Sequence, residues 1–318
     1  MIEEFKKLEN WMSSQIVGQQ HLVQRLLVSL LADGHLLVEG APGLAKTKAV
    51  KTLADGVEGE FQRIQFTPDL LPTDITGTEI FRPQNGTFEF QPGPIFHSLV
   101  LADEINRAPA KVQAALLEAM AERQVSVGRE TYPLPEIFMV MATQNPIEQE
   151  GTYPLPEAQL DRFLMQVSIG YPDHGSEKQI LALARGEALA SAAPAPTSQI
   201  SQASILEARK EVLQVHMADA VEEYLIQLVL ATRQPEKYND KLSGWLEYGA
   251  SPRATIAIDR CARASAWLAQ RDFVSPDDVQ SVLHDCMRHR LILSYEAEAD
   301  GVTADQVIDE LIRQVAVG

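Results

Sequence analysis

Apolar residues recur along the chain with two spacings, which predict alternating helices and strands. Helical spacing predicts two amphipathic helices near the N-terminus, with apolar stripes at Ile2, Phe5, Leu8 and Met12 and at Leu22, Val23, Leu26, Leu27 and Leu30. Short apolar runs predict strands at residues 35–39, 61–66, 97–104, 137–143 and 163–169. Helical spacing between some of these runs predicts helices at residues 48–55 and 111–122. This alternation is typical of an α/β fold with a parallel sheet.

Two stretches interrupt the alternation and predict β-hairpins. Residues 78–81 and 87–90 flank Asn85-Gly86, a strong short-range signal for a tight turn. Residues 125–132 alternate around a glycine in the same manner. We expect the insertions near residues 76–94 and 125–134. The first is either a solvent-facing ornament or an arm that contacts a partner, and this stretch alone favours neither.

The second half of the chain has a different composition. Residues 188–198 form an Ala/Ser/Pro run without periodicity, which predicts a flexible connector. Further on, helix starts are marked by Ser251 before a proline, by Ser275 before a proline, and by Thr303 with Gln306 three residues later. Because 318 residues suggest two domains, we expect an α/β domain over residues 1–174 and an all-helical domain over residues 175–318.

Composition excludes several classes of protein. No apolar run approaches the roughly 18 residues of a membrane helix, and the N-terminus lacks the apolar core of a signal peptide, so we expect a cytoplasmic protein with no membrane partner. A formal net charge of −17 argues against a nucleic-acid-binding surface. Cys261 and Cys286 are far apart in sequence and lack C-x-x-C spacing, so they indicate neither a disulfide framework nor a zinc site.

Residues 40–47, GAPGLAKT, carry the strongest chemical signal. A strand, a tight loop and a helix N-terminus in this order gather backbone N–H groups and a positive dipole end around one point, where a polyphosphate binds. Lys46 would add charge near the β and γ phosphates, and the Thr47 hydroxyl would ligate Mg²⁺. The alternative is a glycine-rich turn without a ligand.

Ala45 stands where the phosphate-loop pattern has its second glycine. If the backbone here has a negative φ, the methyl group costs little. If the loop needs a positive φ, the substitution opposes nucleotide binding.

Two acidic residues end the predicted strand at 97–104. Asp103 and Glu104 would lie at the carboxyl end of a parallel strand, where ligands bind in open α/β sheets. Adjacent buried acids are costly without a cation, and nucleotide-bound Mg²⁺ would meet this need at Asp103. Glu104 would then accept a proton from an attacking water. The alternative is two exposed acids at the start of a loop.

Three further polar residues have two interpretations each. Asn145 either orients a water beside the phosphate or is a turn residue before a proline. Arg162 either forms a surface ion pair or inserts into the nucleotide site of a neighbouring subunit. Arg253 lies in the first turn of a predicted helix, where a cation opposes the helix dipole. This favours an anionic target for Arg253 over a simple surface position.

Together, the motifs resemble the MoxR family of AAA+ ATPases over nearly the whole chain. The resemblance depends on GAPGLAKT at 40–47, LADEINRAP at 101–109, ATQNP at 142–146, PEAQLDRF at 156–163 and GASPRA at 249–254. The family commonly has alanine at the position of Ala45. The resemblance implies an AAA+ P-loop NTPase with an αβα core and a small all-α lid domain. In that core, the strand before Asn145 lies between the phosphate-loop strand and the Asp103 strand.

The resemblance also implies residue roles. Asp103 and Glu104 match the Walker B acids, with Glu104 as catalytic base, and the Mg²⁺ ligands are Thr47 and Asp103. Asn145 matches sensor 1, Arg162 the arginine finger and Arg253 sensor 2. The expected contacts to adenine are Ile16, Val17 and Gly18. Without the resemblance, this segment is interpreted as a turn between two helices. The expected contacts to the phosphates are Gly40, Pro42, Gly43, Leu44, Ala45, Lys46 and Thr47. The hairpins match the helix-2 insert and the pre-sensor 1 insertion.

The implied function is Mg²⁺-dependent ATP hydrolysis by a homo-oligomeric ring, a hexamer, that remodels or matures client proteins. The usual partners in the family carry a von Willebrand factor type A domain. Two alternatives stay open. One is a nucleotide-gated assembly module with little turnover. The presence of Glu104 argues against this module, because a pure switch needs no catalytic base. The other is a DNA-remodelling ring, disfavoured by the −17 charge and by hairpins whose only basic residues are Arg82 and Arg129.

Overall fold

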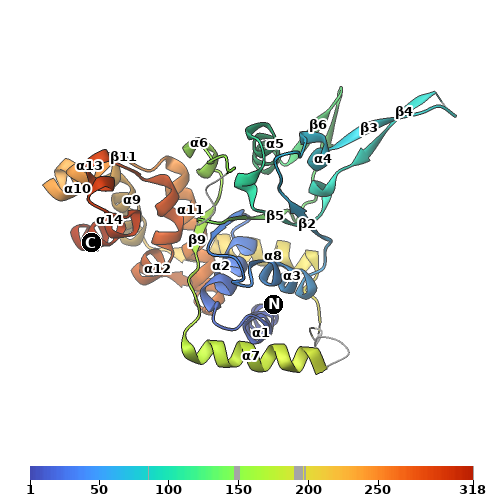
Figure 1. Ribbon diagram of the computed structural model, residues 1–318. Helices are drawn as coiled ribbons and strands as arrows, with labels where there is room; N and C mark the ends of the chain where they lie inside the picture. The colour runs from blue at the N-terminus through green and yellow to red at the C-terminus, as the bar shows by residue number, and fades with distance from the viewer. Residues whose placement is uncertain (85, 147–150, 190–195, 197, 318) are drawn as a thin grey trace.

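The computed structural model describes residues 1–84, 86–146, 151–189, 196 and 198–317. Within these residues, the central sheet contains five parallel strands (Figure 1). In sheet order they are β2 (Phe61–Gln65), β5 (Leu99–Asp103), β8 (Met139–Gln144), β1 (Leu36–Glu39) and β9 (Met165–Ser168). The α/β class is confirmed, and β8 lies between the phosphate-loop strand and the strand that ends at Asp103, as expected.

Successive residues of the central strands face opposite layers of helices, because side chains alternate along a strand. Leu99 and Leu101 pack in one large apolar cluster, which includes residues of α1 (Ile2–Gln15), α2 (Gln20–Leu31), α3 (Lys46–Gly56) and α8 (Gln202–Gln214) and continues into the helices that follow α8. Val100 and Ala102 pack in a second cluster, with α4 (Pro72–Thr76) and α5 (Ala110–Glu122). Both faces of the sheet are therefore covered, which explains why its strands read as near-continuous apolar runs.

Both predicted hairpins form and project from the α5 side of the sheet (Figure 1). The first pairs β3 (Gly77–Arg82) with β4 (Thr87–Pro92), and the second pairs β6 (Gln124–Val127) with β7 (Glu130–Pro133). Asn85 of the predicted turn lies outside the described residues. Phe90 of the first hairpin stacks on Tyr132 of the second, with ring centroids 3.9 Å apart. The two insertions thus support each other.

Beyond α8 the chain is mainly helical. Its longer helices are α9 (Asp219–Arg233), α11 (Pro252–Leu268), α12 (Pro276–Met287) and α14 (Ala304–Gln314), with the shorter α10 (Asp240–Trp245) and α13 (Tyr295–Ala299). Two short strand pairs interrupt the all-helical arrangement that we expected: β10 (His216–Met217) with β12 (Phe273–Val274), and β11 (Leu246–Tyr248) with β13 (Ile292–Leu293). The side chains of Ser251, Ser275 and Thr303 accept N-cap hydrogen bonds, which confirms the predicted helix starts.

Helix α7 (His174–Leu189), which the sequence patterns did not indicate, follows β9 and crosses the bottom of the molecule in Figure 1. None of its described residues is buried. Residues 190–195 and 197 of the predicted connector at 188–198 lie outside the described residues. The domain boundary at residue 174 stays a prediction. Apolar residues of α8 and α11 share one buried cluster with α1 and α2, so the two halves have a common core. No helix in the described ranges is long and apolar enough to cross a membrane.

Buried ion pairs also connect the two halves. Asp285 on α12 accepts a hydrogen bond from Arg25 Nε on α2 at 2.6 Å. Burial raises the pKa of Asp285, but His21, Arg25 and Arg288 outweigh it and hold that pKa well below its usual range. Removing one partner of such a buried group is strongly destabilising, because it leaves an uncompensated charge. The core and the lid are therefore joined by charge as well as by apolar packing.

The two cysteines, far apart in sequence, are neighbours in the fold. Cys261 on α11 and Cys286 on α12 are both buried free thiols. Burial and the Cys286 thiol raise the pKa of Cys261 well above its usual value. A thiol that stays protonated is unreactive, which favours a packing role for Cys261, and Cys286 is buried in the same apolar cluster.

Candidate functional site

The predicted phosphate loop connects β1 to α3, as its sequence implies. A Cβ atom at Gly40 would lie 2.4 Å from the Ile169 side chain, so only glycine fits beside β9. Gly43 has a φ of +85°, which also favours glycine. The Lys46 ammonium donates a hydrogen bond to the Gly40 carbonyl at 2.6 Å and so lies across the loop. Burial lowers the pKa of Lys46, although the negative charges of Asp103, Glu104 and Glu39 offset part of this effect.

Ala45 adopts the less favourable of its two alternatives. Its φ is +58° and its ψ is +20°, which is the left-handed region. For a residue with a Cβ this conformation costs about 1–2 kcal/mol. Ala45 is also the N-cap of α3, so the strain lies at the point where the helix begins to present its N–H groups.

The loop and the acidic strand end meet in one cavity of about 390 Å³. Its lining includes Lys46, Thr47, Asp103, Glu104 and Asn145, together with residues 42–45 and 48. The structure therefore brings together all of the predicted residues that were expected around the γ-phosphate of the chain's own nucleotide. Asn145, the residue after β8, is 6% exposed and lines this cavity.

A second cavity, of about 310 Å³, lies on the other side of the loop. Ile16 and Val17 line it with Leu44 of the loop and with Ile180 and Leu183 of α7. Residues 42–45 and 48 line both cavities. Gly18 does not line the second cavity. It packs against Pro172 and Ser176, and a Cβ atom at Gly18 would lie 3.0 Å from both side chains. Charged and polar side chains line the first cavity, whereas aliphatic side chains are prominent in the second, and this arrangement fits phosphates and a base respectively.

The two acids are held by residues that the sequence analysis missed. Asp103 Oδ2 accepts a hydrogen bond from Arg63 Nη2 at 2.6 Å, and Asp103 Oδ1 accepts one from Thr143 Oγ1 at 2.6 Å. Arg63 lies on β2, which is next to β5 in the sheet. Thr143 is the last residue of the strand predicted at 137–143, two positions before Asn145. The polar residues within the predicted strand at 61–66 indicated that this strand has polar contacts. The residue that Arg63 contacts could be known only from the order of the strands in the sheet.

Glu104 has a φ of +56° and leaves the line of β5, as its proposed role requires. Its backbone N–H donates to Thr143 Oγ1 at 2.9 Å. Its carboxylate accepts hydrogen bonds from Gln65 Nε2 at 3.0 Å and from Arg107 Nη1 at 3.0 Å. These contacts hold the carboxylate at the wall of the cavity.

The donor set of this cavity fits Mg²⁺. A carboxylate from Asp103 and a hydroxyl from Thr47 line the same space, and Mg²⁺ in nucleotide sites typically takes one or two protein oxygens besides phosphates and waters. Arg63 already occupies Asp103 Oδ2, so a metal ion has to share that carboxylate with the guanidinium or displace it.

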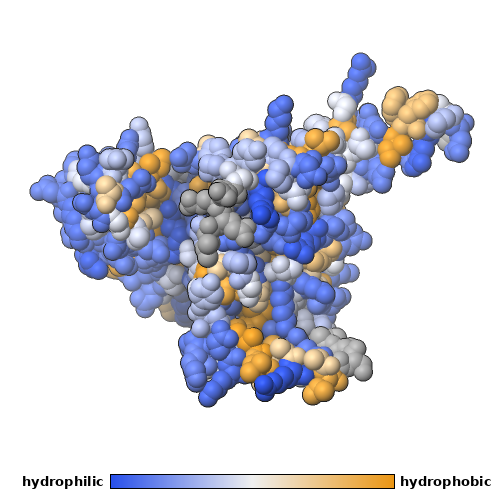
Figure 2. Space-filling view, viewed as in Figure 1, coloured by the Kyte–Doolittle hydropathy of each residue, from blue (hydrophilic) through white to orange (hydrophobic). Residues whose placement is uncertain are grey.

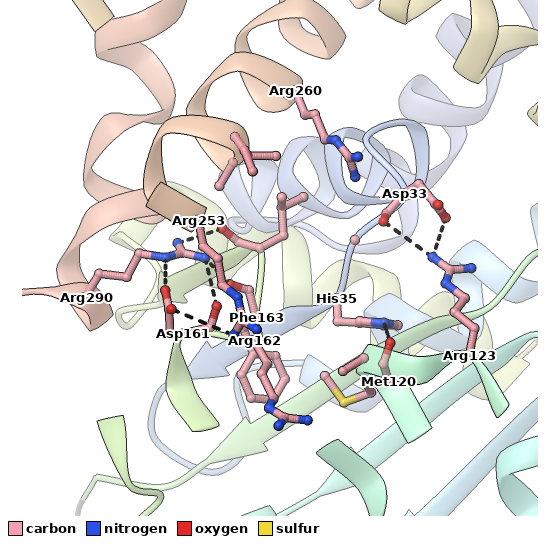
Figure 3. A pocket seen from close by; sticks show the side chains of 15 residues that line it. Asp33, His35, Met120, Arg123, Asp161, Arg162, Phe163, Arg253, Arg260 and Arg290 are labelled. Atoms are coloured by element: carbon pink, nitrogen blue, oxygen red, sulfur yellow. Dashed lines mark hydrogen bonds and ion pairs between the residues drawn. The ribbon is translucent and has the colours of Figure 1, made fainter. Parts of the chain in front are cut away.

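Arg162 and Arg253 lie elsewhere, in a third cavity of about 340 Å³ (Figure 3). Neither residue lines the two cavities at the phosphate loop. Arg162 follows α6 (Glu157–Leu160) and donates from Nη1 to the Leu117 carbonyl at 2.8 Å. Arg253 is in the first turn of α11, with Nη1 3.8 Å from Asp161 Oδ2. The two arginines are thus brought to each other and kept away from the chain's own phosphate loop.

Comparison with known proteins places this geometry in a family. Residues 35–165 match the ATPase family associated with various cellular activities (AAA), and residues 244–311 match the AAA lid domain. The chain is 48% identical to the chaperone MoxR1 of Mycobacterium tuberculosis, over 95% of this chain and 79% of that protein. It is 34% identical to the protein MoxR of Paracoccus denitrificans, over 91% of this chain and 89% of that protein.

A solved structure agrees with the sequence matches. The crystal structure of a protein from Cytophaga hutchinsonii superposes with a TM-score of 0.93 at 45% identity, and covers 100% of this chain and 96% of that one. The motifs, the strand order and the lid all agree with these matches. The chain belongs to the MoxR family of AAA+ ATPases.

Proposed function

We propose that this protein is a Mg²⁺-dependent ATPase that assembles as a ring, a hexamer, and uses hydrolysis to remodel or mature client proteins. One observation carries the proposal. The phosphate loop and the acidic end of β5 line one cavity, while Arg162 and Arg253 lie together in another. This arrangement supports a site that is completed by a neighbouring protomer.

Each residue of the phosphate-side cavity has a distinct task in this proposal. Lys46 and the N–H groups at the start of α3 bind the β and γ phosphates of ATP. Glu104 accepts the proton of the attacking water, and Asn145 positions that water. Thr47 and Asp103 would hold Mg²⁺, which would neutralise charge on the phosphate oxygens. The apolar cavity beside Ile16 and Val17 takes the adenine.

The two arginines support action in trans. A head-to-tail contact between identical protomers joins two different surfaces, and such contacts form a ring when the rotation between neighbours closes. It would set the cavity of Arg162 and Arg253 against the phosphates bound by the next protomer. An arginine finger is worth roughly 10³–10⁵ in turnover, so an isolated protomer is expected to be nearly inert.

The Glu104→Gln variant tests the proposed chemistry. It removes the base but leaves the loop intact, so ATP should bind with parental affinity while turnover falls at least about a hundredfold. Binding is measured with a fluorescent ATP analogue and turnover by phosphate release. Glu60→Gln, at an 82% exposed side chain on the approach to β2, serves as the control and should leave both unchanged. Parental turnover in Glu104→Gln would refute the assignment of the base.

The first hairpin supports contact with a client. Phe81 and Phe88 are 51% and 68% exposed, lie opposite each other in the hairpin and have ring centroids 5.2 Å apart. Figure 2 shows hydrophobic residues exposed on the projecting hairpin. Paired exposed aromatic residues on a projecting arm are typical of interaction sites. We propose a protein with a von Willebrand factor type A domain as the partner.

Affinity capture with the Glu104→Gln form and ATP tests this proposal. The ring should retain such a partner, and adding Phe81→Ser and Phe88→Ser should release it. Tyr295→Ser, at an 81% exposed aromatic on α13, is the matched control. Equal capture with and without the two phenylalanines would contradict a role for the hairpin.

A nucleotide-gated module with little turnover is the second candidate. The hydrogen bonds of Arg63 to Asp103 and of Gln65 and Arg107 to Glu104 favour it, because they occupy both acids. Turnover measured with saturating partner decides between the two candidates.

A further inference from the structure

The cavity that contains Arg162 and Arg253 is strongly basic. Its lining includes five arginines and two carboxylates, in a chain whose formal net charge is −17. The arginines are Arg123, Arg162, Arg253, Arg260 and Arg290, and the carboxylates are Asp33 and Asp161. Like charges gathered in a partly buried space are unfavourable unless counter-charges offset them. What the cavity can bind therefore depends on which of these arginines already have a partner within the chain.

Two of the five are neutralised within the chain. Arg123 Nη2 donates to Asp33 Oδ1 at 2.6 Å. Arg290 Nε donates to Asp161 Oδ1 at 2.8 Å, and the rest of its guanidinium donates to backbone carbonyls, including that of Phe163. Both carboxylates of the cavity are thus engaged, and these two arginines act as its structural wall.

Three arginines are left without a close carboxylate among the described residues. In the part of the chain that the structure describes, Arg162 donates a hydrogen bond only to the Leu117 carbonyl. Arg253 Nη1 is 3.8 Å from Asp161 Oδ2, and Asp161 already pairs with Arg290. Arg260 has no hydrogen bond or ion pair to any residue in the described ranges. Figure 3 shows its guanidinium in the space between Arg253 and Asp33, with no dashed line to it.

The sequence of α11 accounts for this placement. Arg253, Ile256, Ala257 and Arg260 all line the cavity, at spacings of i, i+3, i+4 and i+7. Residues at these spacings share one helix face. Arg260 therefore stands about 10 Å further along the helix than Arg253, from a rise of about 1.5 Å per residue. The two guanidinium groups can reach different parts of one extended anion.

We infer that Arg260 is a third cationic contact, beside Arg162 and Arg253, to the polyphosphate of the nucleotide bound by the neighbouring protomer. The inference rests on the proposed shared site and adds a residue to it. Guanidinium groups form charge-assisted hydrogen bonds with phosphate oxygens, and three of them lining one cavity match the several charges of a triphosphate.

The test begins with Arg260→Gln and Arg260→Met, the second of which keeps the apolar stem. Removing a charge-assisted contact should lower kcat/KM for ATP about ten- to a hundredfold. Arg260→Lys keeps the charge and should restore part of the loss. Arg313→Gln, at a 65% exposed arginine on α14, is the control and should keep parental kinetics. A melting temperature equal to that of the parent separates a lost contact from a folding defect.

Mixed rings then test whether Arg260 acts in trans. A Glu104→Gln protomer supplies an intact Arg260 but has no active site of its own, whereas an Arg260→Gln protomer keeps an intact site. In a random 1:1 mixture about one interface in four joins an intact site to an intact arginine, so turnover should rise to about a quarter of the parental value. A mixture no more active than the mean of its two components would overturn the inference.

The same mixing with Arg162→Ala separates this inference from the proposed function. Recovery with Arg162→Ala but not with Arg260→Gln would overturn the role of Arg260 alone. Failure of both would overturn the shared site itself. Parental turnover in Arg260→Gln combined with lost client capture would also overturn the inference and would assign the cavity to an acidic client segment.

Discussion

Ala45 carries backbone strain at the point where the phosphate loop becomes a helix. Its left-handed φ of +58° is a conformation that glycine adopts at little cost, and the phosphate-loop pattern has glycine there. The chain keeps alanine, so the surrounding loop and α3 hold the strained geometry in place. The strain belongs to the folded state only, which makes it measurable.

Replacing Ala45 with glycine should raise the free energy of unfolding by about 0.5–1 kcal/mol, because relief of the left-handed strain outweighs the added freedom of the unfolded chain. Chemical denaturation measures the change. Ala114→Gly is the matched control, since Ala114 is exposed inside α5, where glycine costs about 1 kcal/mol. A loss of stability in both variants would show that Ala45 is not strained.

His35 is a buried neutral histidine just before β1. A backbone N–H can only donate, so Nδ1 accepts from Val140 N at 3.0 Å, and Nε2 carries the proton that is shared with the Met120 carbonyl at 3.3 Å. Burial first, and then the charge of Arg123, lower the pKa of His35 to about 4. Protonation would put a hydrogen on Nδ1 against the Val140 N–H.

The stability of the fold should therefore fall as the pH is lowered from about 6.5 to about 4. In this window the unfolded chain binds a proton at residue 35 that the folded chain does not, which costs about 3 kcal/mol in full. His35→Gln should reduce this pH dependence of the free energy of unfolding, although burial of His289 leaves a further contribution because it lowers that pKa as well. His216→Gln, at an exposed histidine, should leave the profile unchanged. An unaltered profile for His35→Gln would contradict the assignment.

At the scale of elements, α7 matters because it closes the apolar cavity beside the phosphate loop. It contributes Ile180 and Leu183 to the lining, and Lys48 of α3 pairs with Glu187 of α7 at 2.7 Å. The apolar residues of α7 do not form one buried stripe, because Ile180 and Leu183 line the cavity whereas Leu181 and Leu189 are 52% and 90% exposed. This helix therefore lacks the clear amphipathic pattern that sequence periodicity detects.

Replacing Leu183 with serine should weaken ATP binding about five- to thirtyfold, because a half-buried leucine loses about 1–2 kcal/mol of apolar contact with the base. Leu181→Ser is the control on the same helix, since Leu181 is 52% exposed and does not line the cavity. Titration with a fluorescent ATP analogue measures both. Equal affinities for the two variants would contradict an adenine site beneath α7.

At the scale of the whole molecule, the two halves of the proposed site lie in different cavities of one chain. The proposed base Glu104, Lys46 and the proposed Mg²⁺ ligands Thr47 and Asp103 line the cavity at the phosphate loop, and the proposed finger Arg162 lines the cavity beside α11. In this proposal, one chain alone does not provide the complete set around its own loop. Ring assembly would supply the missing part.

Specific ATPase activity should accordingly rise steeply with protein concentration and level off once rings form. Phosphate release measured over a dilution series, with sedimentation at the same concentrations, gives both the activity and the oligomeric state. Arg162→Ala should stay low at every concentration although it assembles. Activity independent of concentration across the range in which protomers dissociate would contradict the shared site.

Local features were predictable because they depend on neighbours in sequence. The caps at Ser251, Ser275 and Thr303, and the strand, loop and helix around Lys46, follow from residue types a few positions apart. The order of the motifs indicated the family, and through it the position of β8 in the sheet. The conformation of Ala45 was left open, because both signs of φ were compatible with the sequence.

Contacts between distant residues were decided only by the tertiary structure. Arg63 reaches Asp103 because β2 lies beside β5, and Cys261 meets Cys286 because α11 packs on α12. The grouping of Arg260 with Arg162 and Arg253 depends on how α11 packs against the segment before β9. Sequence spacing along a helix or strand sets which side chains share a face, but only the packing of those faces sets what each one meets.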